Sequence, residues 1–363
     1  MSVGVGVIGA GVISDTYLTN LNSFSDVSVR FVADLDTDRA ATQAAKHDVS
    51  GSGTVAQLLD RDDIELVVNL TIPAAHAEVG TAVLAAGKHL WQEKPLATNR
   101  EDAAALLALA EANGLRVACA PDTVLGPGLQ TARRAIESGR IGKPATGLAL
   151  FQSRGPDAWH PGPEFLFQAG GGPLFDIGPY YLTTLALIFG PVHRVTATGT
   201  RARTQRVIQA GPRVGTVFDV TEPTTVNALI EFSGGGSAQL LMSFDSGVPR
   251  ACVEVTGEHG SLILPDPNNF DGDTVWCPVT GDEEQTFPSA GHAATRGIGV
   301  LDLARSIRAG VPERASGRLA YHVLDVMAGV DDAARSGEPV LIESGFEPVP
   351  LLPTDWDPLA STV

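Results

Sequence analysis

Two kinds of hydrophobic pattern divide the chain. In the first third, short runs of β-branched residues alternate with alanine-rich stretches in which apolar residues recur at helical spacing. We expect strands at residues 3–8, 27–33, 66–71, 89–92 and 115–120, and helices at residues 13–21, 38–47, 74–86 and 100–112. Strands that alternate with helices are typical of right-handed crossovers and a parallel sheet. The first third therefore predicts a parallel α/β domain.

The pattern changes near residue 121. A helix is expected at residues 126–140, a strand at 147–151, a long irregular stretch at 154–173 and a helix at 180–189. Farther on, glycine-containing turns between alternating strands predict two hairpins, 226–232 with 238–244 and 251–256 with 261–264, and helices return at 300–309 and 320–336. We therefore expect an α/β domain at residues 1–122 and an α+β domain with a mostly antiparallel sheet at residues 123–363.

Length and charge narrow the classes of protein to consider. The chain has 363 residues, which is enough for two domains of ordinary size. Its 25 basic and 42 acidic residues give a formal charge of −17, which argues against nucleic acid and membrane surfaces as partners. The three cysteines are far apart, so we expect neither a disulfide framework nor a metal site.

The compartment is inferred from the same features. The apolar start lacks basic residues and is broken by glycines, so no signal peptide is expected. Apolar runs elsewhere are far shorter than the ~20 residues that span a bilayer. Together with the few cysteines, these features predict a cytoplasmic protein.

A glycine turn follows the first expected strand. Gly9-Ala10-Gly11 leads into Val12 and Ile13, which begin the first expected helix. A first glycine permits the tight turn, and a second lets backbone N–H groups approach a pyrophosphate at the helix N-terminus. The third position of this fingerprint is Ser14, so the motif is incomplete.

A carboxylate at the end of the second strand supports the same interpretation. Asp34 lies 23 residues after Gly11, close to the roughly 20-residue offset of the carboxylate that binds the adenosine ribose. The acidic residues beside it would repel a 2′-phosphate, which favours NAD over NADP, whereas Arg39 weakens that preference. The alternative is an ordinary strand–helix turn with a surface aspartate. We favour a dinucleotide site because motif and context agree.

Two further segments carry candidate chemistry. Thr71 ends the strand expected at 66–71, Pro73 and His76 follow it, and Glu93-Lys94-Pro95 follows the next strand. Ligands of open parallel sheets bind outside the carboxyl ends of the strands, so both segments should lie beside the glycine turn. Lys94 could then donate a proton, although in isolation it would read as a surface lysine.

The second segment is a glycine-rich run that leads into a helix. Gly170-Gly171-Gly172 precedes Asp176, which could cap the helix, and Tyr180, which would share a helix face with Asp176. In isolation, a helix cap and a core aromatic would be the simpler interpretation.

Taken together, these motifs resemble a known family. Gly9-x-Gly11, Pro73-x-x-His76, Glu93-Lys94-Pro95 and Gly171-Gly172-x-x-x-Asp176-x-Gly178-x-Tyr180 occur in the order found in the glucose–fructose oxidoreductase / inositol dehydrogenase (Gfo/Idh/MocA) family. The resemblance covers nearly the whole chain. It implies an N-terminal Rossmann domain and a C-terminal α/β domain whose open sheet often forms an oligomer interface, so a homodimer or homotetramer is expected.

The resemblance also implies an activity. Family members transfer hydride between NAD(P) and a carbonyl or secondary alcohol, mostly on sugars and cyclic polyols. The family lysine corresponds to Lys94 and the family aspartate to Asp176. The usual family histidine corresponds to Tyr180, as in some relatives similar to sugar or dihydrodiol dehydrogenases. Either Lys94 or Tyr180 could transfer the proton, with Asp176 orienting the substrate ring.

Three other residues are weaker candidates for substrate contact. His160 lies in the long irregular stretch after a tryptophan, Asp122 follows the last strand of the first domain, and Arg296 precedes a glycine before a late helix. His160 could equally be a solvated loop residue.

Three functional classes follow. We favour an NAD(P)-dependent dehydrogenase or reductase acting on a sugar-like alcohol. A glycoside hydrolase that oxidises its substrate transiently with bound NAD is the second, because relatives of this fold do so. A non-catalytic NAD(H)-binding regulator is the third, although it would not need Lys94, Asp176 and Tyr180.

Overall fold

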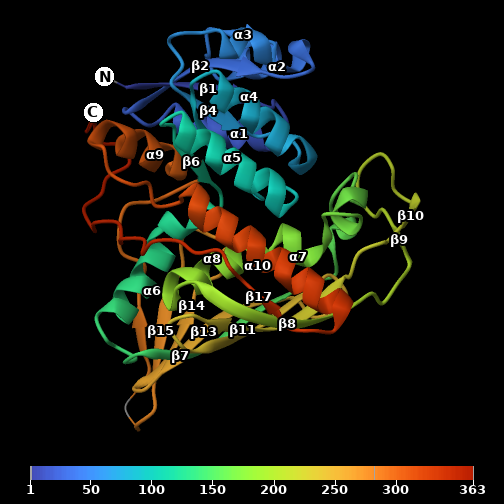
Figure 1. Cartoon of the computed structure of the whole chain (residues 1–363), viewed down its shortest axis with the longest axis vertical. Coiled ribbons are helices and arrows are strands. Elements are labelled where there is room, and N and C mark those ends of the chain that lie inside the picture. Colours follow the sequence, from blue (N-terminus) through green and yellow to red (C-terminus); the bar gives the residue numbers. More distant parts are fainter. Residues whose placement is uncertain (1, 282, 363) are drawn as a thin grey trace. The chain divides into compact units, whose positions relative to one another are not determined.

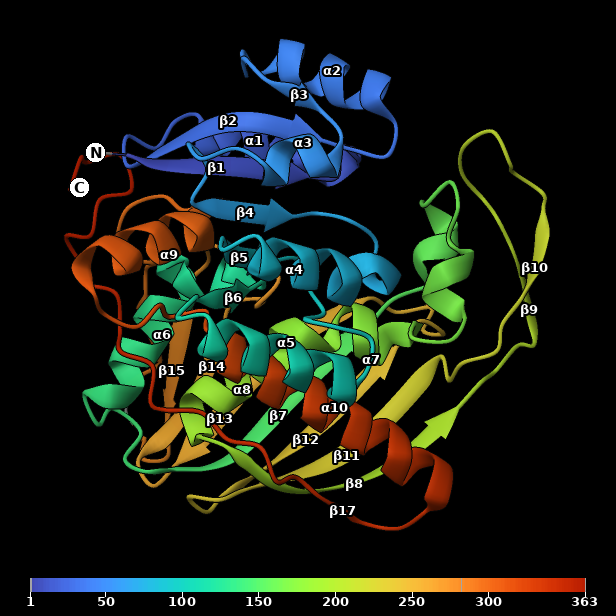
Figure 2. The ribbon, with the colours of Figure 1, turned by 45° about the horizontal axis from the view of Figure 1, so that its top comes forward.

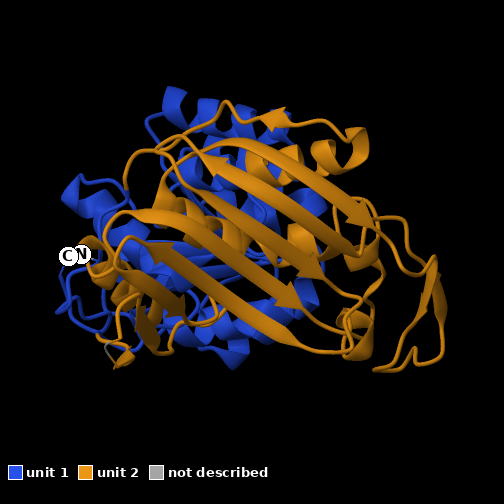
Figure 3. Cartoon of the chain, turned by 90° about the horizontal axis from the view of Figure 1, so that it is seen from below, with its two compact units in different colours: residues 1–127, 291–324, 349–363 blue, residues 128–290, 325–348 orange. Residues whose placement is uncertain are grey.

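The computed structural model describes residues 2–281 and 283–362 and divides into two compact units. Unit 1 comprises residues 1–127, 291–324 and 349–363, and unit 2 comprises residues 128–290 and 325–348 (Figure 3). The division is therefore discontinuous in sequence, unlike the single expected boundary after residue 122.

Unit 1 is built on a six-stranded, wholly parallel sheet in the order β3-β2-β1-β4-β5-β6 (Figures 1 and 2). Its strands are β1 (Val3–Ile8), β2 (Val27–Ala33), β3 (Ser52–Gly53), β4 (Leu66–Asn69), β5 (His89–Gln92) and β6 (Val117–Cys119). Its helices are α1 (Val12–Leu21), α2 (Thr37–Lys46), α3 (Val55–Leu59), α4 (His76–Ala85), α5 (Arg100–Ala112) and α9 (Ile298–Ala309). The strand order reverses between β1 and β4, which is the switch point where such sheets bind ligands.

The late helix α9 belongs to unit 1 because of what its apolar face packs against. Val300, Leu303 and Ala304 lie in the same buried cluster as Val5 of β1 and Tyr17 of α1. The hydrophobic periodicity predicts that a helix forms here, but it does not reveal which core the helix joins. This is why the expected domain boundary and the compact units differ.

Unit 2 is built on a nine-stranded sheet in the order β16-β15-β14-β13-β7-β12-β11-β8-β17. Every pair is antiparallel except β7 and β12, which are parallel. The strands are β7 (Pro144–Gln152), β8 (Val192–Thr200), β11 (Thr225–Phe232), β12 (Ser237–Ser243), β13 (Arg250–Gly257), β14 (Gly260–Leu264), β15 (Thr274–Pro278), β16 (Gln285–Phe287) and β17 (Val340–Leu341). The expected fold class, a parallel sheet followed by a mostly antiparallel one, is confirmed.

Helices cover one face of this sheet. Leu185 and Phe189 of α8 (Gly178–Phe189) pack against Gly147 of β7, where a side chain larger than hydrogen would crowd them. The opposite face shows its strands without a covering helix (Figure 3). The remaining helices are α6 (Pro127–Glu137), α7 (Gly172–Asp176) and α10 (Gly317–Ser336), the last of which continues from unit 1 residues into unit 2 residues.

An additional two-stranded arm leaves the sheet between β8 and β11. It consists of β9 (Gln205–Val207) and β10 (Val217–Asp219), paired antiparallel (Figure 1). Neither this arm nor the short elements β3 and α3 was expected from the sequence, because each is too short to show a period. Among the described residues, no helix is both long and apolar enough to cross a bilayer.

Candidate active site

The glycine turn of unit 1 has the geometry that the sequence predicts. Gly9 has a φ of 101°, and a Cβ there would come within 2.8 Å of the Leu70 carbonyl group. Only glycine fits this position. Gly11, in contrast, has an ordinary φ of −75°, and nothing lies within 4 Å of the point where its Cβ would be. The space beside Gly11 is therefore open, at the N-terminus of α1, where no side chain caps the helix.

Ser14 explains why the third glycine of the fingerprint is dispensable in this chain. Its side chain is fully buried, and its hydroxyl donates to the Gly11 carbonyl at 2.6 Å and accepts from Gln43 Nε2 at 2.9 Å. The buried Ser14 hydroxyl therefore stabilises the turn from the protein side. It leaves the open side of Gly11 unchanged.

Asp34 at the end of β2 holds the turn and its own loop together. Its Oδ2 accepts from the Ala10 N–H at 2.7 Å, and its Oδ1 accepts from the Asp36 N–H at 2.9 Å. Arg39 approaches both oxygens, with Nη2–Oδ1 at 2.5 Å and Nε–Oδ2 at 3.3 Å. Although burial opposes ionisation, these hydrogen bonds hold the pKa of Asp34 below its ordinary value. Asp34 is therefore an ionised carboxylate with Arg39 tethered to it.

Three large apolar side chains at this edge of the sheet are exposed. Val12 after β1, Leu35 after β2 and Ile72 after β4 are 97%, 98% and 70% exposed. These loops follow three neighbouring strands of the sheet. Exposed apolar residues grouped at a ligand edge are typical of a binding surface for a flat apolar group. Val12 is among the residues expected from the glycine motif, whereas Leu35 and Ile72 were not predicted, although apolar residues in polar loops are a signal visible in the sequence.

The Glu93-Lys94-Pro95 segment is fixed by a buried hydrogen-bond chain. Tyr17 of α1 donates to Glu93 Oε1 at 2.8 Å and accepts from Trp91 Nε1 at 3.2 Å. Glu93 Oε2 accepts from the Lys94 N–H at 2.9 Å, and the Lys94–Pro95 peptide bond is cis. Burial, and then the charge of Glu93, raise the pKa of Tyr17, so the phenol remains a donor. The chain connects the helix after the glycine turn to the backbone of Lys94.

His76 lies inside this edge of the sheet. It is fully buried, and its ring nitrogens lie 2.7 Å from the Pro95 carbonyl oxygen and 3.0 Å from the Thr71 carbonyl oxygen. Burial lowers the pKa of His76, which favours the neutral ring. The Asn69 side chain fixes Thr71 in turn, at 2.7 Å from its hydroxyl. His76 therefore joins the loops after β4 and β5.

Asp122 and Arg296 lie at the start of α9. Asp122 is fully buried, and its Oδ2 accepts from the N–H groups of Gly297 at 2.7 Å and Gly299 at 3.3 Å. Its Oδ1 is buried without a hydrogen-bond partner among the described residues. Burial raises the pKa of Asp122 to about 6. The structure thus places Asp122 as a buried acceptor at a helix N-terminus, and Arg296 in the half-buried loop before that helix.

In unit 2, Asp176 and Tyr180 lie on either side of a break between two helices. Asp176 is the last residue of α7, and Tyr180 is in the first turn of α8. The N-cap of α8 is Ile177, so the expectation that Asp176 caps this helix is wrong. Asp176 is half-buried and Tyr180 is buried. Gly172, with a φ of 83°, begins α7 and supplies the conformation that turns the preceding loop into it.

His160 belongs to an aromatic group in the loop before α7. Its ring lies edge-on to Trp159 and Phe165, with centroid distances of 5.5 and 5.6 Å, and its Nδ1 accepts from the Gly162 N–H at 3.0 Å. Trp159 is 66% exposed and Phe165 is 52% exposed. No cluster of His, Cys, Asp or Glu suited to a metal occurs within the described residues.

The open glycine turn, the helix N-terminus and the ionised Asp34 define a dinucleotide-binding protein of the Rossmann class. Family models specify it further. Residues 3–120 match the model described as "Oxidoreductase family, NAD-binding Rossmann fold", and residues 129–263 match the GFO/IDH/MocA C-terminal domain. The chain belongs to the Gfo/Idh/MocA family of oxidoreductases.

Individual proteins of known name are similar over most of the chain. The trans-1,2-dihydrobenzene-1,2-diol dehydrogenase of Mus musculus is 28% identical over 295 residues, covering 79% of this chain and 80% of the relative. An NAD-binding oxidoreductase from Klebsiella pneumoniae superposes with a TM-score of 0.84 at 21% identity, covering 94% and 99% of the two chains. A levoglucosan dehydrogenase solved with NADH and levoglucosan superposes with a TM-score of 0.82 at 20% identity, covering 95% and 100%. The two solved structures support the fold.

The residues of unit 1 fit a bound NAD. The space beside Gly11 accommodates a pyrophosphate near the first N–H groups of α1, Asp34 suits a ribose hydroxyl, and the apolar Leu35 and Ile72 suit the adenine. The family model that matches this unit describes an NAD-binding fold.

Proposed function

We propose that this oxidoreductase interconverts a secondary alcohol and a carbonyl on a cyclic diol, polyol or sugar, with NAD as the preferred cofactor. The observation that carries the proposal is the position of the Lys94 segment. It follows β5 at the same sheet edge as the glycine turn, and its backbone is tied by Glu93 and Tyr17 to the helix that begins there. A lysine so fixed beside a dinucleotide site is suited to proton transfer.

The cofactor would be held by the residues already described. The N–H groups of Val12 and Ile13 would bind its pyrophosphate, and Asp34 would bind the adenosine ribose. Nicotinamide supplies the hydride acceptor or donor when bound. Thr71, Pro73, His76 and Glu93 shape the loops around this edge, and His76 acts from within by holding two of them together.

We assign Lys94 and Tyr180 to the reacting hydroxyl, with one of them accepting its proton on oxidation and returning it on reduction. Asp176 would accept a hydrogen bond from a neighbouring hydroxyl and thereby orient the ring. Asp122 and Arg296 would position α9 rather than contact the substrate.

Two properties of relatives support this class of substrate. The mouse relative is named for a cyclic 1,2-diol, and the levoglucosan dehydrogenase was solved with levoglucosan. The aromatic group at Trp159, His160 and Phe165 suits a substrate with an apolar ring face and hydroxyls at its rim.

We also propose a cytoplasmic homodimer or homotetramer formed through the bare face of the nine-stranded sheet. One row of paired residues crosses that face: Leu229, Gln239, Leu148, Glu254 and Ile263, from β11, β12, β7, β13 and β14. Leu229 and Ile263 are exposed. Apolar residues spread over a bare sheet face favour association with a second copy.

The proposal is tested by a nicotinamide-absorbance screen. The wild-type chain is assayed with NAD and with NADP against inositols, aldoses, anhydrosugars, cyclic diols and glycosides, with free sugar measured in parallel. We expect cofactor reduction with a cyclic diol, polyol or sugar, and a loss of about a hundredfold or more in kcat for Lys94→Ala and for Tyr180→Phe. Near wild-type turnover in both variants would refute the assignment of these residues. Sugar release without net cofactor reduction would refute the proposed reaction.

A further inference from the structure

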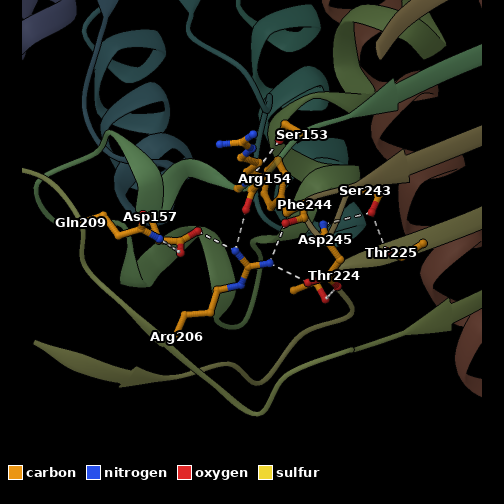
Figure 4. Close-up of polar contacts among 11 residues, drawn as sticks. Ser153, Arg154, Asp157, Arg206, Gln209, Thr224, Thr225, Ser243, Phe244 and Asp245 are labelled. Carbon is orange, nitrogen blue, oxygen red and sulfur yellow. Dashed lines mark hydrogen bonds and ion pairs between the residues drawn. The ribbon is translucent and has the colours of Figure 1, made fainter. Parts of the chain in front are cut away.

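A buried arginine joins three segments of unit 2. Arg206 of β9 is 3% exposed. Its Nη1 donates to the Arg154 carbonyl at 2.9 Å and to Asp157 at 2.6 Å, and its Nη2 donates to the Phe244 carbonyl and to Asp245, both at 2.6 Å (Figure 4). Four of the five donors of the guanidinium are therefore used. Its Nε is buried without a hydrogen-bond partner among the described residues.

The acceptors identify what Arg206 joins. Arg154 follows β7 and Phe244 follows β12, and because these strands are parallel neighbours, both exits lie at one edge of the sheet. One backbone hydrogen bond, from Ser153 N–H to the Ser243 carbonyl at 2.9 Å, already ties the exits together. Arg206 adds the arm β9–β10 to this junction. Asp245 is held further by the Thr224 hydroxyl.

The Arg206 side chain contacts the long loop before α7 at both ends of the loop. Asp157, near the beginning of the loop, is bound by the guanidinium, and the Gln209 N–H donates to the Asp157 carbonyl at 2.9 Å. Near the end of the loop, the guanidinium lies over the Phe167 ring, with its Cζ 4.8 Å from the ring centroid. Such a cation–π contact is strongest when it is buried, as it is here.

The contact with Phe167 extends to the candidate site. Phe167 belongs to a buried cluster with Leu166, Ile208, Phe218, Val220 and Phe244, and Ile177 packs against that cluster. Ile177 is next to Asp176 and three residues before Tyr180. A continuous path of packed side chains thus leads from Arg206 to the junction of α7 and α8.

The aromatic group of Trp159, His160 and Phe165 lies between the two ends of the loop that Arg206 contacts. Apart from two short 3-10 turns, the loop has no regular structure over residues 153–171. Exposed Trp159 and Phe165 are therefore held by the ends of the loop and by the ion pair of Glu164 with Arg213 at 2.5 Å. Placing a substrate to within a fraction of an ångström requires such support.

We infer that Arg206 is the positioning residue for the substrate side of this enzyme. It fixes the loop at residues 154–167, so that Trp159, His160 and Phe165 form a platform for the apolar face of a ring-shaped substrate, and it sets the place of Asp176 through Phe167 and Ile177. The inference rests on the proposed function and adds to it a residue that touches neither substrate nor cofactor. Lysine cannot replace Arg206, because it lacks the planar fork that reaches four acceptors.

The test compares Arg206→Met and Arg206→Lys with Arg194→Met. Arg194 is a matched control because it is also a unit 2 arginine paired with a carboxylate, its Nε and Nη2 both donating to Glu231 Oε1, but both groups are exposed. Amide hydrogen exchange over residues 154–171 is measured without any ligand. NAD affinity is measured by fluorescence, and kcat and KM are measured with the substrate from the screen.

We expect faster exchange of the loop in both Arg206 variants and unchanged exchange in β1. The substrate KM should rise by about a hundredfold in Arg206→Met, because the loop that places the substrate is displaced. NAD affinity should stay within about twofold, because the contacts of Arg206 described above are all with residues of unit 2. Arg194→Met should match the wild type in every measurement. If the methionine variant does not fold, the lysine variant carries the same comparison.

The proposed aromatic platform is tested separately by two variants of the exposed residue Trp159. Trp159→Ala should raise KM by about tenfold, whereas Trp159→Phe keeps a ring face and should stay within about threefold. The proposed role of Arg206 would be overturned by either of two results in Arg206→Met. In the first, the amide hydrogens of the loop exchange at the wild-type rate. In the second, they exchange faster but KM is unchanged. Equal KM values in the two Trp159 variants would overturn the platform. A wild-type chain that oxidises no alcohol would defeat the proposed function, while the exchange data would still decide whether Arg206 holds the loop.

Discussion

At the scale of single residues, two glycines that are two positions apart in the chain have different reasons to be glycine. Gly9 is required by the protein itself, since its φ is positive and the Leu70–Thr71 backbone just after β4 lies against it. Gly11 is not required by any neighbouring protein atom, because the space beside it is open. The first glycine therefore serves folding, and we propose that the second serves the cofactor.

This difference yields a paired prediction. Gly9→Ala should lower the free energy of unfolding by about 2 kcal/mol or more, because it combines backbone strain with a clash against backbone. Gly11→Ala should cost about 1 kcal/mol or less but weaken NAD binding by about tenfold or more. Urea unfolding and cofactor fluorescence titration measure the two effects. Equal losses of stability in the two variants would contradict this separation.

The pH dependence of stability should report on Asp122. Burial raises its pKa from an ordinary 3.8 to about 6, so the folded state holds this proton more tightly than the unfolded state. A carboxyl of this kind stabilises the fold below pH 4 and loses that contribution as the pH rises through 6. Relative to Asp122→Asn, the wild type should lose about 2 kcal/mol between pH 4 and pH 7. Unfolding of both proteins at several pH values checks this, and a difference independent of pH would show that the carboxyl does not titrate as described.

At the scale of elements, the loop after β2 combines two tasks. Asp34 anchors the glycine turn through the Ala10 N–H, and it also tethers Arg39, which is half exposed. A tethered arginine is not available to a 2′-phosphate, which is why the loop as a whole should favour NAD.

Releasing the arginine should change the choice of cofactor. Asp34→Ser removes the repulsion and frees Arg39, so the ratio of NADP to NAD affinity should rise by about tenfold or more. The double variant Asp34→Ser with Arg39→Ala is the control, and it should lose the gain in NADP affinity while keeping the loss of NAD affinity. Dissociation constants are measured by cofactor fluorescence. A gain in NADP affinity that survives in the double variant would mean that Arg39 does not bind the phosphate.

Elements with a long local pattern were predictable from the sequence. The strands at Val3–Ile8, Val27–Ala33 and His89–Gln92 and the helix at Arg100–Ala112 have the expected bounds. Short elements such as β9 and β10 were not predicted, since three residues show no period. The Asp122 contact to Gly297 and the Arg206 contact to Asp157 were not predicted either, because their partners lie 175 and 49 residues apart in sequence.

At the scale of the whole molecule, the local sequence pattern gives the least information about which elements pack into the same core. The glycine turn, Asp34 and the Lys94 loop could be assigned to one sheet edge, because the carboxyl ends of parallel strands meet there. The return of α9 to unit 1 could not be predicted, because it depends on which core its apolar face enters. The family resemblance added residue roles that periodicity alone does not carry.

The proposed association through the nine-stranded sheet leads to a prediction about oligomeric state. Leu229 is the β11 member of the row that crosses the bare face, so Leu229→Glu would place a charge where two copies meet and should shift the protein to monomers. The unfolding midpoint of the isolated chain should change little, because the side chain points away from the core. Val279→Glu is the control, since Val279 is also an exposed apolar residue but lies in the loop after β15. Light scattering coupled to size exclusion measures both variants. An oligomer that persists in Leu229→Glu, or a wild type that is already monomeric, would remove this face as the interface.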